Sequence, residues 1–203
     1  MIAILTADII NSAQYETEAW MRVLKAALSQ WGEAPHDWEI YRGDEFQLRT
    51  SPQQALKIAV ELKARLKCIK DLDLRIAIGL GDEQYRGQGV SESNGTAHQR
   101  SGRMLEVLKK KKKNMGIDTG SPKHNRSLNL VIDLAMDFMD SWSTVSAEIA
   151  KISLAQPGIT QTAIASELQI KQSAVSQRRK RARLSLVLDM LHYYTQILKE
   201  IQL

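Results

Sequence analysis

The stretch over residues 39–48 constrains the fold most, because it predicts a β-hairpin whose turn carries two acids. Apolar and polar residues alternate loosely on both sides of Gly43, as in a hairpin with one solvated face. Gly43 provides the backbone freedom for a tight turn, and Asp44 and Glu45 follow it directly. Adjacent carboxylates at a hairpin tip repel each other unless a cation or solvent compensates them. The chain is therefore expected to contain a sheet with an acidic site at one end.

A further acid interrupts the first apolar run of the chain. Residues 2–12 are typical of a β-strand, and Asp8 is the acid within it. A carboxylate in a buried strand costs free energy unless it is paired or binds a metal. If this strand and the hairpin are neighbours, Asp8 and Asp44 converge, and Mg²⁺ binds through such carboxylate pairs together with substrate phosphates. The alternative is that both acids are ordinary capping or turn carboxylates.

Helical and strand patterns alternate as far as residue 122. Apolar spacing predicts helices over residues 16–30, 52–66 and 94–108, a central strand over 72–80, and a glycine-bearing loop or strand over 84–90. The order β-α-β-β-α-β-α is that of a ferredoxin-like or palm domain, which we expect over residues 1–122. Residues 123–129 are interpreted as a linker.

Beyond the linker, every predicted element is helical. The predicted helices span residues 128–141, 144–154, 160–168, 172–183 and 184–201. We therefore expect an α+β protein in which an all-helical domain over residues 128–203 follows the palm-like domain.

Two of these helices carry a pattern that is typical of a helix-turn-helix. Ala165, Leu168, Ile170 and Val175 have the spacing that packs two short helices across a tight turn, with Ala165 small enough for close approach. The pattern resembles the helix-turn-helix of bacterial regulators and of the sigma-factor DNA-binding region, except that Gln169 replaces the usual glycine of the turn.

This resemblance predicts how the second of the two helices would contact DNA. The residues expected to face base edges are Gln172, Ser173, Ser176, Gln177 and Lys180, and those expected to contact phosphates are Arg178, Arg179, Arg181 and Arg183. The alternative is a solvated basic face on a helical bundle. The charge distribution favours DNA, because residues 141–203 contain 8 Lys and Arg against 4 Asp and Glu.

The acids of the first strand and the hairpin also carry a resemblance. Asp8-Ile9 and residues 42–46 resemble the palm domain of class III nucleotidyl cyclases and GGDEF-type diguanylate cyclases. The resemblance implies that Asp8, Asp44 and the carbonyl of Ile9 hold Mg²⁺ over a nucleotide. The residues that it implies for nucleotide binding are Arg42, Gly43, Glu45, Gln99 and Arg103. The chain has Gln99 where the cyclases have Asn, and Ile40 where they have a purine-reading Lys or Glu.

Taken along the chain, four motifs resemble the SatD-like family of bacterial proteins. They are Thr-Ala-Asp-Ile-Ile-Asn-Ser at 6–12, Tyr-Arg-Gly-Asp-Glu-Phe-Gln at 41–47, Glu-Ser-Asn-Gly at 92–95, and Gln-Ser-Ala-Val-Ser-Gln at 172–177. The resemblance covers nearly the whole chain and implies a cyclase-like front half joined to a regulator-like tail.

These observations lead us to expect a DNA-binding transcriptional regulator whose palm-like domain binds a nucleotide with Mg²⁺ as a sensor. The alternative is a nucleotidyl cyclase or related phosphoryl-transfer enzyme with a helical dimerisation tail, and a third possibility is a protein-interaction adaptor. The single cysteine, Cys68, excludes an internal disulfide framework and favours a reducing cytoplasm, and no apolar run is long enough to span a membrane.

The last predicted helix suggests an oligomeric state. Its apolar stripe includes Leu184, Leu188, Leu191, Leu198 and Ile201 and recurs over more than one heptad. We expect it to contribute to the seam of a homodimer, and the alternative is that it packs on the predicted helix over residues 128–141.

Overall fold

The computed structural model of the chain describes residues 1–41 and 43–201. It has an α+β fold in which a five-stranded sheet is combined with helices. The elements in chain order are β1 (Ile2–Ile10), α1 (Thr17–Leu28), β2 (Trp38–Tyr41), β3 (Glu45–Thr50), α2 (Pro52–Leu66), β4 (Asp73–Gly81), α3 (Thr96–Lys111), β5 (Met115–Asp118), α4 (Pro122–Met139), α5 (Thr144–Ala155), α6 (Gln161–Glu167), α7 (Gln172–Arg181) and α8 (Leu184–Ile201). Short 3₁₀ turns lie at Ser12–Gln14 and Val90–Glu92.

The sheet has the strand order β2-β3-β1-β4-β5. The predicted hairpin is confirmed, because β2 and β3 pair antiparallel on either side of the acidic turn. The central strand β1 is antiparallel to both β3 and β4, whereas β4 and the edge strand β5 are parallel. The long apolar strands β1 and β4 thus occupy the middle of the sheet, where both faces are covered.

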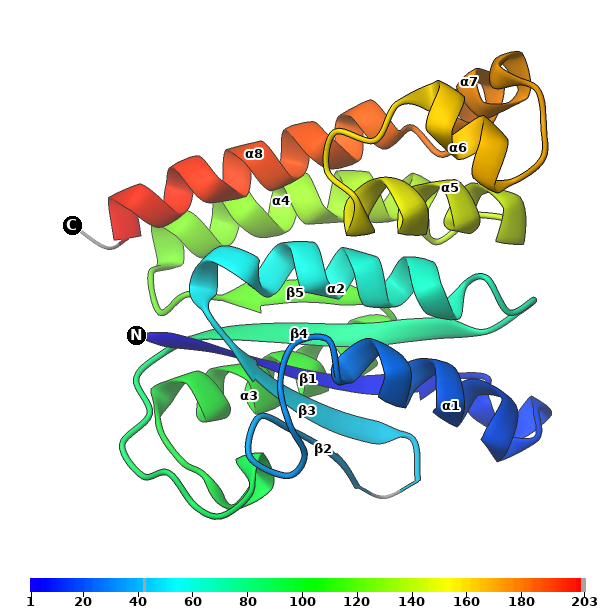
Figure 1. The fold of residues 1–203 in the computed structure, drawn as a ribbon. Helices are drawn as coiled ribbons and strands as arrows, with labels where there is room; N and C mark the ends of the chain where they lie inside the picture. The colour runs from blue at the N-terminus through cyan, green and yellow to red at the C-terminus, as the bar shows by residue number, and fades with distance from the viewer. Residues whose placement is uncertain (42, 202–203) are drawn as a thin grey trace.

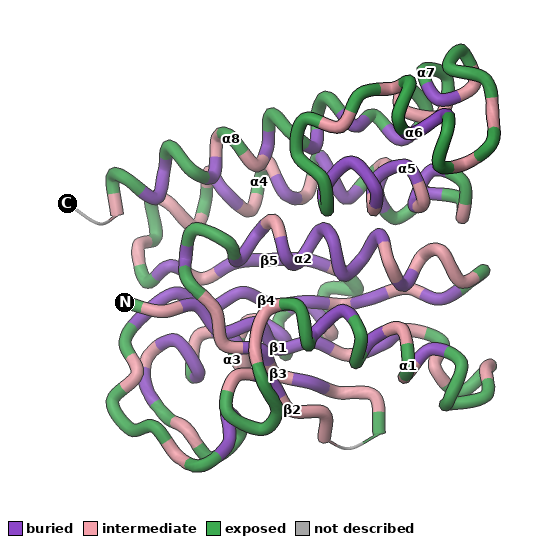
Figure 2. The backbone as a smooth tube through the Cα atoms, in the orientation of Figure 1, coloured by how far each residue is buried: buried purple, intermediate pink, exposed green. Residues whose placement is uncertain are grey.

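Helices cover both faces of the sheet, and the last helices add a further layer (Figure 1). The side chains of α1 and α2 share one core with the inward residues of β1, including Leu5 and Ile9, while α3 packs on β4 and β1 from the opposite face. Helices α5 and α8 pack on the outer side of α2. Because α2 lies between the sheet and these helices, most of its residues are buried, as the purple colour of its tube shows (Figure 2).

The predicted linker over residues 123–129 is wrong, because these residues form the first turns of α4. Pro122 opens that helix at a position where its missing N–H costs nothing. The amide of Asn129 then bonds the edge strand β5 in both directions: its oxygen accepts from the N–H of Ile117 at 2.9 Å and its nitrogen donates to the Ile117 carbonyl at 2.8 Å. The segment therefore caps a sheet edge that would otherwise be exposed.

Interactions also cross the predicted domain boundary. The buried ammonium of Lys63 on α2 lies 2.6 Å from a carboxylate oxygen of Asp73 on β4 and 2.6 Å from one of Asp140 at the end of α4. The hydroxyl of Tyr194 on α8 donates to the carbonyl of Pro52 at 2.6 Å. One hydrophobic core consequently extends from β1 to α8, and the division into two domains stays a prediction.

Within residues 1–41 and 43–201, no helix has the length and apolarity needed to cross a membrane.

Candidate functional site

Asp8 lies in a cluster of four charged side chains on the face of the sheet that α3 covers. The strand register places Asp8 directly between Glu45 on β3 and Arg75 on β4. A guanidinium nitrogen of Arg75 lies 2.8 Å from the Oδ2 atom of Asp8. The ammonium of Lys109 reaches across from α3 to lie 2.9 Å from the Oε1 atom of Glu45. The two acids are thus each compensated by one base.

The electrostatics of this cluster leave one oxygen poorly satisfied. Burial raises the pKa of Asp8, and the positive charges of Arg75 and Lys109 only partly oppose that effect. The Oδ1 atom of Asp8 is buried and has no hydrogen-bond partner within the described part of the chain. The hydrogen bond from Lys109 to Glu45 raises the pKa of the Lys109 ammonium. A buried oxygen of this kind is a position that a cation or a donor group of a ligand can occupy favourably.

Asp44 has a different environment from Asp8. Its carbonyl accepts a hydrogen bond from the N–H of Ile9 at 3.2 Å, and its Oδ2 atom accepts one from the hydroxyl of Ser12 at 2.7 Å. Its side chain lines a hollow of about 360 Å³ together with Tyr15, Thr17 and Trp20, the last two of which belong to α1. The residue directly opposite Asp8 in the sheet is Glu45, not Asp44. Asp44 comes one position earlier in the chain, and neighbouring residues of a strand point to opposite faces.

The other residues implied for nucleotide binding are spread more widely. Gln99 and Arg103 are exposed on α3, and neither forms a hydrogen bond or an ion pair with Asp8, Asp44 or Glu45. Gly43 has a φ of 85°, the left-handed conformation that favours glycine in this turn.

Arg42 lies outside the described residues. Groups of three or more His, Cys, Asp or Glu side chains arranged to hold a metal ion do not occur in the portion of the chain that the structure describes.

Sequence reasoning missed the two bases of the cluster. Arg75 belongs to an apolar strand and is brought to Asp8 by the β1–β4 register, which local periodicity does not specify. Lys109 belongs to a run of five lysines, of which it is the one that bonds Glu45. A sequence signal exists only for Arg75, because a charged residue in a central strand needs a charged or polar partner.

The α6–α7 pair forms a compact unit with its own small core. The residues buried in that core come from α5, α6 and α7: Ile149, Ile152, Ile164, Ala165 and Val175. Leu168 and Ile170 pack against it from the connection between α6 and α7. The four positions chosen from the sequence therefore all contribute to the contact between these helices.

The connection between α6 and α7 is a tight left-handed turn. Gln169 has a φ of 52°, and the N–H of Ile170 donates to the carbonyl of Ala165 at 3.0 Å, which ends α6. The side chain of Thr160 accepts a hydrogen bond from the N–H of Ala163 and caps the start of α6. Gln169 thus adopts the backbone conformation in which glycine is usual, at a cost of about 1 kcal/mol.

Most residues that were predicted to contact DNA lie on one exposed face of α7. Its exposed members are Gln172, Ser173, Ser176, Gln177, Lys180 and Arg181, and Lys171 is exposed at the N-cap. Val175 faces the opposite way, into the small core. This face combines hydrogen-bonding side chains with positive charge. Helix α7 itself lies away from the sheet (Figure 1).

Three arginines near this face are engaged within the chain. A guanidinium nitrogen of Arg178 lies 3.3 Å from a carboxylate oxygen of Glu148 on α5. Arg179 is half-buried and donates to the hydroxyl of Ser153 at 3.4 Å. Arg183 stacks on Phe138, with 5.4 Å between its guanidinium carbon and the ring centroid. Arg178 and Arg179 therefore turn toward α5 in this structure.

The apolar stripe of α8 is largely used within the chain. Buried residues of this helix include Leu184, Val187, Met190, Tyr194, Ile197 and Leu198, which pack in the main core. Helix α8 contacts α4, in agreement with the alternative interpretation of the stripe, and also α2. Leu188 is the member of the predicted seam that stays most open, at 43% exposure.

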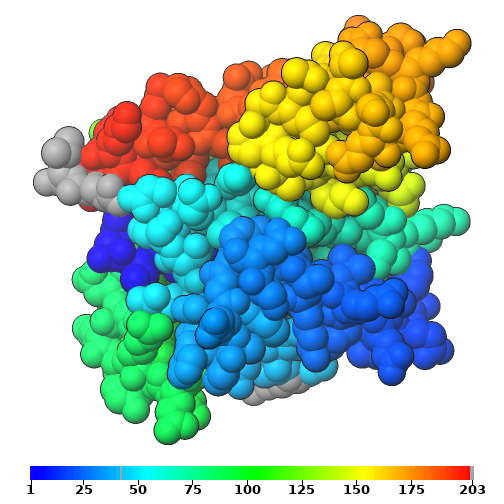
Figure 3. Space-filling view, in the orientation of Figure 1, coloured from blue at the N-terminus to red at the C-terminus, as the bar shows by residue number. Residues whose placement is uncertain are grey.

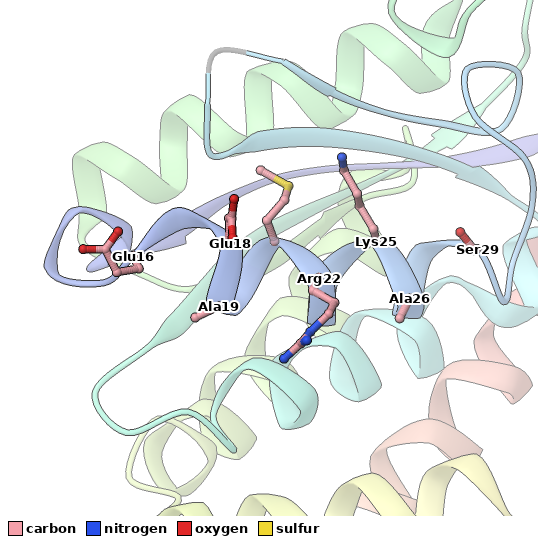
Figure 4. Close-up of a pocket in the computed structure, with 8 residues that line it drawn as sticks. Glu16, Glu18, Ala19, Arg22, Lys25, Ala26 and Ser29 are labelled. Carbon is pink, nitrogen blue, oxygen red and sulfur yellow. The ribbon is translucent and has the colours of Figure 1, made fainter.

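A wide surface hollow of about 830 Å³ runs along α1. Its lining residues lie on α1 or directly beside its ends, and Arg22 points away from Glu18 and Lys25 (Figure 4). Because these charges diverge on a single helix, the hollow does not assemble a site.

Comparison of the chain with models of known protein families finds no match, and comparison with curated proteins finds none either.

Proposed function

We propose that this chain is a DNA-binding transcriptional regulator in which α6 and α7 act as a helix-turn-helix and α7 enters the major groove. The observation that carries this proposal is the exposed face of α7, which offers Gln172, Ser173, Ser176 and Gln177 beside Lys180 and Arg181. Amide and hydroxyl side chains can read base edges, while exposed cations displace counterions from phosphates. Reading of bases also requires that α7 be held in a fixed orientation. The small core around Val175, which packs α7 on α5 and α6, supports such an orientation.

DNA binding can be tested by selection of binding sites from random duplexes, followed by fluorescence anisotropy with the selected sequence. Gln177→Ala should relax the preference at one base pair by about 1–3 kcal/mol, because a single side chain reads one base edge. Gln54→Ala, which removes an exposed amide from α2, is the matched control and should leave the preference unchanged. Absence of salt-sensitive DNA binding, with or without nucleotide, would exclude the regulator.

We further propose that the front half of the chain, with a palm-like arrangement, binds a nucleotide with Mg²⁺ as a sensor. The supporting observation is the buried Oδ1 atom of Asp8, which lies next to Glu45 and has no hydrogen-bond partner among residues 1–41 and 43–201. Carboxylate oxygens are the ligands that Mg²⁺ prefers, and Asp8 and Glu45 fit such an ion better as a pair than Asp8 and Asp44 do. When bound, the ion would supply charge compensation for nucleotide phosphates. Arg75 and Lys109 would be released from the carboxylates to contact anionic groups.

The sensor can be tested by calorimetric titration with ATP or GTP in the presence of Mg²⁺. Asp8→Asn should abolish binding, whereas Asp82→Asn, which changes an exposed acid just beyond β4, should not. Chromatography of the same mixtures addresses the enzyme alternative. We expect no cyclic or dinucleotide product, because Gln99 and Arg103 are exposed on α3 and form no hydrogen bond or ion pair with Asp8 or Glu45. Product formation that is lost in Asp8→Ala would instead favour the cyclase.

A homodimer would suit a palindromic DNA site. Because the core already covers much of α8, the proposed seam is limited to its exposed apolar positions, of which Leu186 is the most open at 50% exposure. Light scattering at micromolar concentration should give the mass of a dimer, and a monomer would exclude it.

A further inference from the structure

A cavity of about 400 Å³ lies where the front and tail regions of the chain meet. Its lining includes Lys57 from α2, Ser153 and Leu154 from α5, Arg179 from α7, and Leu188 and Leu191 from α8. On the face drawn in Figure 3, α2 (cyan), the connection between α5 and α6 (yellow) and α8 (red) meet. Its volume falls within the range of small-molecule sites, which is about 300–1,000 Å³.

The charged side chains of the cavity have no acidic partner among the residues that the structure describes. Lys57 makes no hydrogen bond or ion pair with any described residue, and Arg179 makes no ion pair within the same part of the chain. The interaction that Arg179 does make is the long hydrogen bond to Ser153. Two cations from different helices that face one cavity without a carboxylate form a site with net positive charge, which favours an anion.

The rest of the wall is apolar and partly open to solvent. Leu154 is buried, whereas Leu188 is 43% exposed and Leu191 is half-buried. Leu188 is one of the most exposed large apolar residues of the tail, although Val187 and Met190 beside it are buried. An apolar group placed in the cavity would remove this surface from water, which is favourable in proportion to the area covered.

We propose that this cavity is a binding site for a small organic acid, whose carboxylate lies between Lys57 and Arg179 and whose apolar body covers Leu188 and Leu191. A guanidinium donates two parallel hydrogen bonds to a carboxylate, and the ammonium adds a point charge from the opposite wall. Inorganic anions would satisfy the charges but would leave the leucines exposed. The proposal does not depend on DNA binding or on the nucleotide sensor, because none of its residues belongs to the Asp8 cluster or to the exposed face of α7.

The site also connects the two halves of the chain. Lys57 belongs to α2, which packs under the tail helices, and Arg179 belongs to α7. A carboxylate that binds both residues would therefore hold α7 against α2. Such a ligand would act as an effector by fixing the orientation of α7.

The test uses the full chain and three probes: 4-phenylbutyrate, its neutral isostere 4-phenylbutanamide, and inorganic phosphate. Binding is followed by calorimetry and by changes in the tryptophan and methyl NMR signals. We expect saturable binding of the acid that is at least about ten-fold tighter than that of the amide, because a charged hydrogen-bonded pair is lost in the amide. Phosphate should not compete with the acid at equal concentration.

Variants locate the binding to this cavity. Arg179→Gln and Lys57→Gln should each weaken acid binding about ten-fold and leave amide binding unchanged. Leu188→Ala should weaken acid and amide alike, and Lys25→Gln on α1 is the control that should change neither. Thermal unfolding checks that each variant is folded. If Arg179→Gln does not fold, Lys57→Gln provides the test of the charged wall. The proposal would be overturned if the acid bound no more tightly than the amide, or if phosphate competed with the acid. It would also be overturned if neither cation variant changed the affinity for the acid, or if no saturable binding occurred.

Discussion

The salt dependence of DNA binding gives the sharpest test of α7, because the number of free cations on its exposed side can be counted. Lys171, Lys180 and Arg181 are exposed and form no ion pair with any described residue. Arg178 is paired with Glu148, and Arg179 faces a cavity. If α7 binds DNA as proposed, these three side chains are the ones available for phosphate contacts.

Three contacts correspond to a slope of log K against log salt of about −2.7, so that raising salt from about 50 to 200 mM should weaken binding about 40-fold. The double variant Lys180→Gln/Arg181→Gln leaves one contact, which predicts a slope of about −0.9 and a loss of only about 3.5-fold over the same range. Anisotropy of a short labelled duplex, measured at several salt concentrations with a fixed pH, gives both slopes.

The matched control is Arg22→Gln/Lys25→Gln, which removes the same charge from α1, a helix remote from α7 (Figure 1). Its slope should equal that of the unchanged protein. If the α7 variant keeps a slope near −2.7, or if the slope of the α1 control falls as much as that of the α7 variant, then α7 does not contact the phosphates.

Three further predictions concern stability. Gln169→Gly should raise the free energy of unfolding by up to about 1 kcal/mol in urea titrations, because glycine adopts the left-handed conformation of this turn without strain; a loss would contradict the turn geometry. Lys63→Met should lower the free energy of unfolding by only about 2–3 kcal/mol, because Asp73 keeps its ion pair with Lys67 and Asp140 can turn to solvent. Asp140→Asn should lower it by less than about 1 kcal/mol, because Asp140 is partly exposed. Equal losses in the two variants would argue against a buried ion cluster. Burial raises the pKa of Asp8 above its ordinary value of 3.8, so folding favours the protonated form of this side chain. The stability that Asp8 contributes should therefore be present below pH 3.8 and decline as the pH rises above it. Unfolding of Asp8→Asn across this range should lack that decline, and identical pH profiles would refute the assignment.

Local patterns in the sequence determined much of the secondary structure. The spacing of apolar residues predicted α2 and α8 at their observed bounds, and the alternation around Gly43 predicted the hairpin. The positions of Ala165, Leu168, Ile170 and Val175 predicted which side of α7 would face inward. These features depend on residues a few positions apart, whose side chains share a face by helix or strand geometry alone.

The tertiary structure alone decided which distant residues meet. The β1–β3 register placed Glu45, rather than Asp44, opposite Asp8, and a shift of one residue in a strand changes every partner. The short strand β5 was missed because four residues carry little periodicity, and its edge is completed by Asn129 from a segment that was predicted to be a linker.

The same holds for the charges that compensate each site. Lys109 reaches Glu45, Arg178 pairs with Glu148, and Arg179 shares a cavity with Lys57 on α2. Composition and local spacing determined that the tail is basic and that α7 has a polar face. Which of those basic groups are free for a ligand was decided only by packing, because a long flexible side chain takes the direction in which the folded chain offers it a partner.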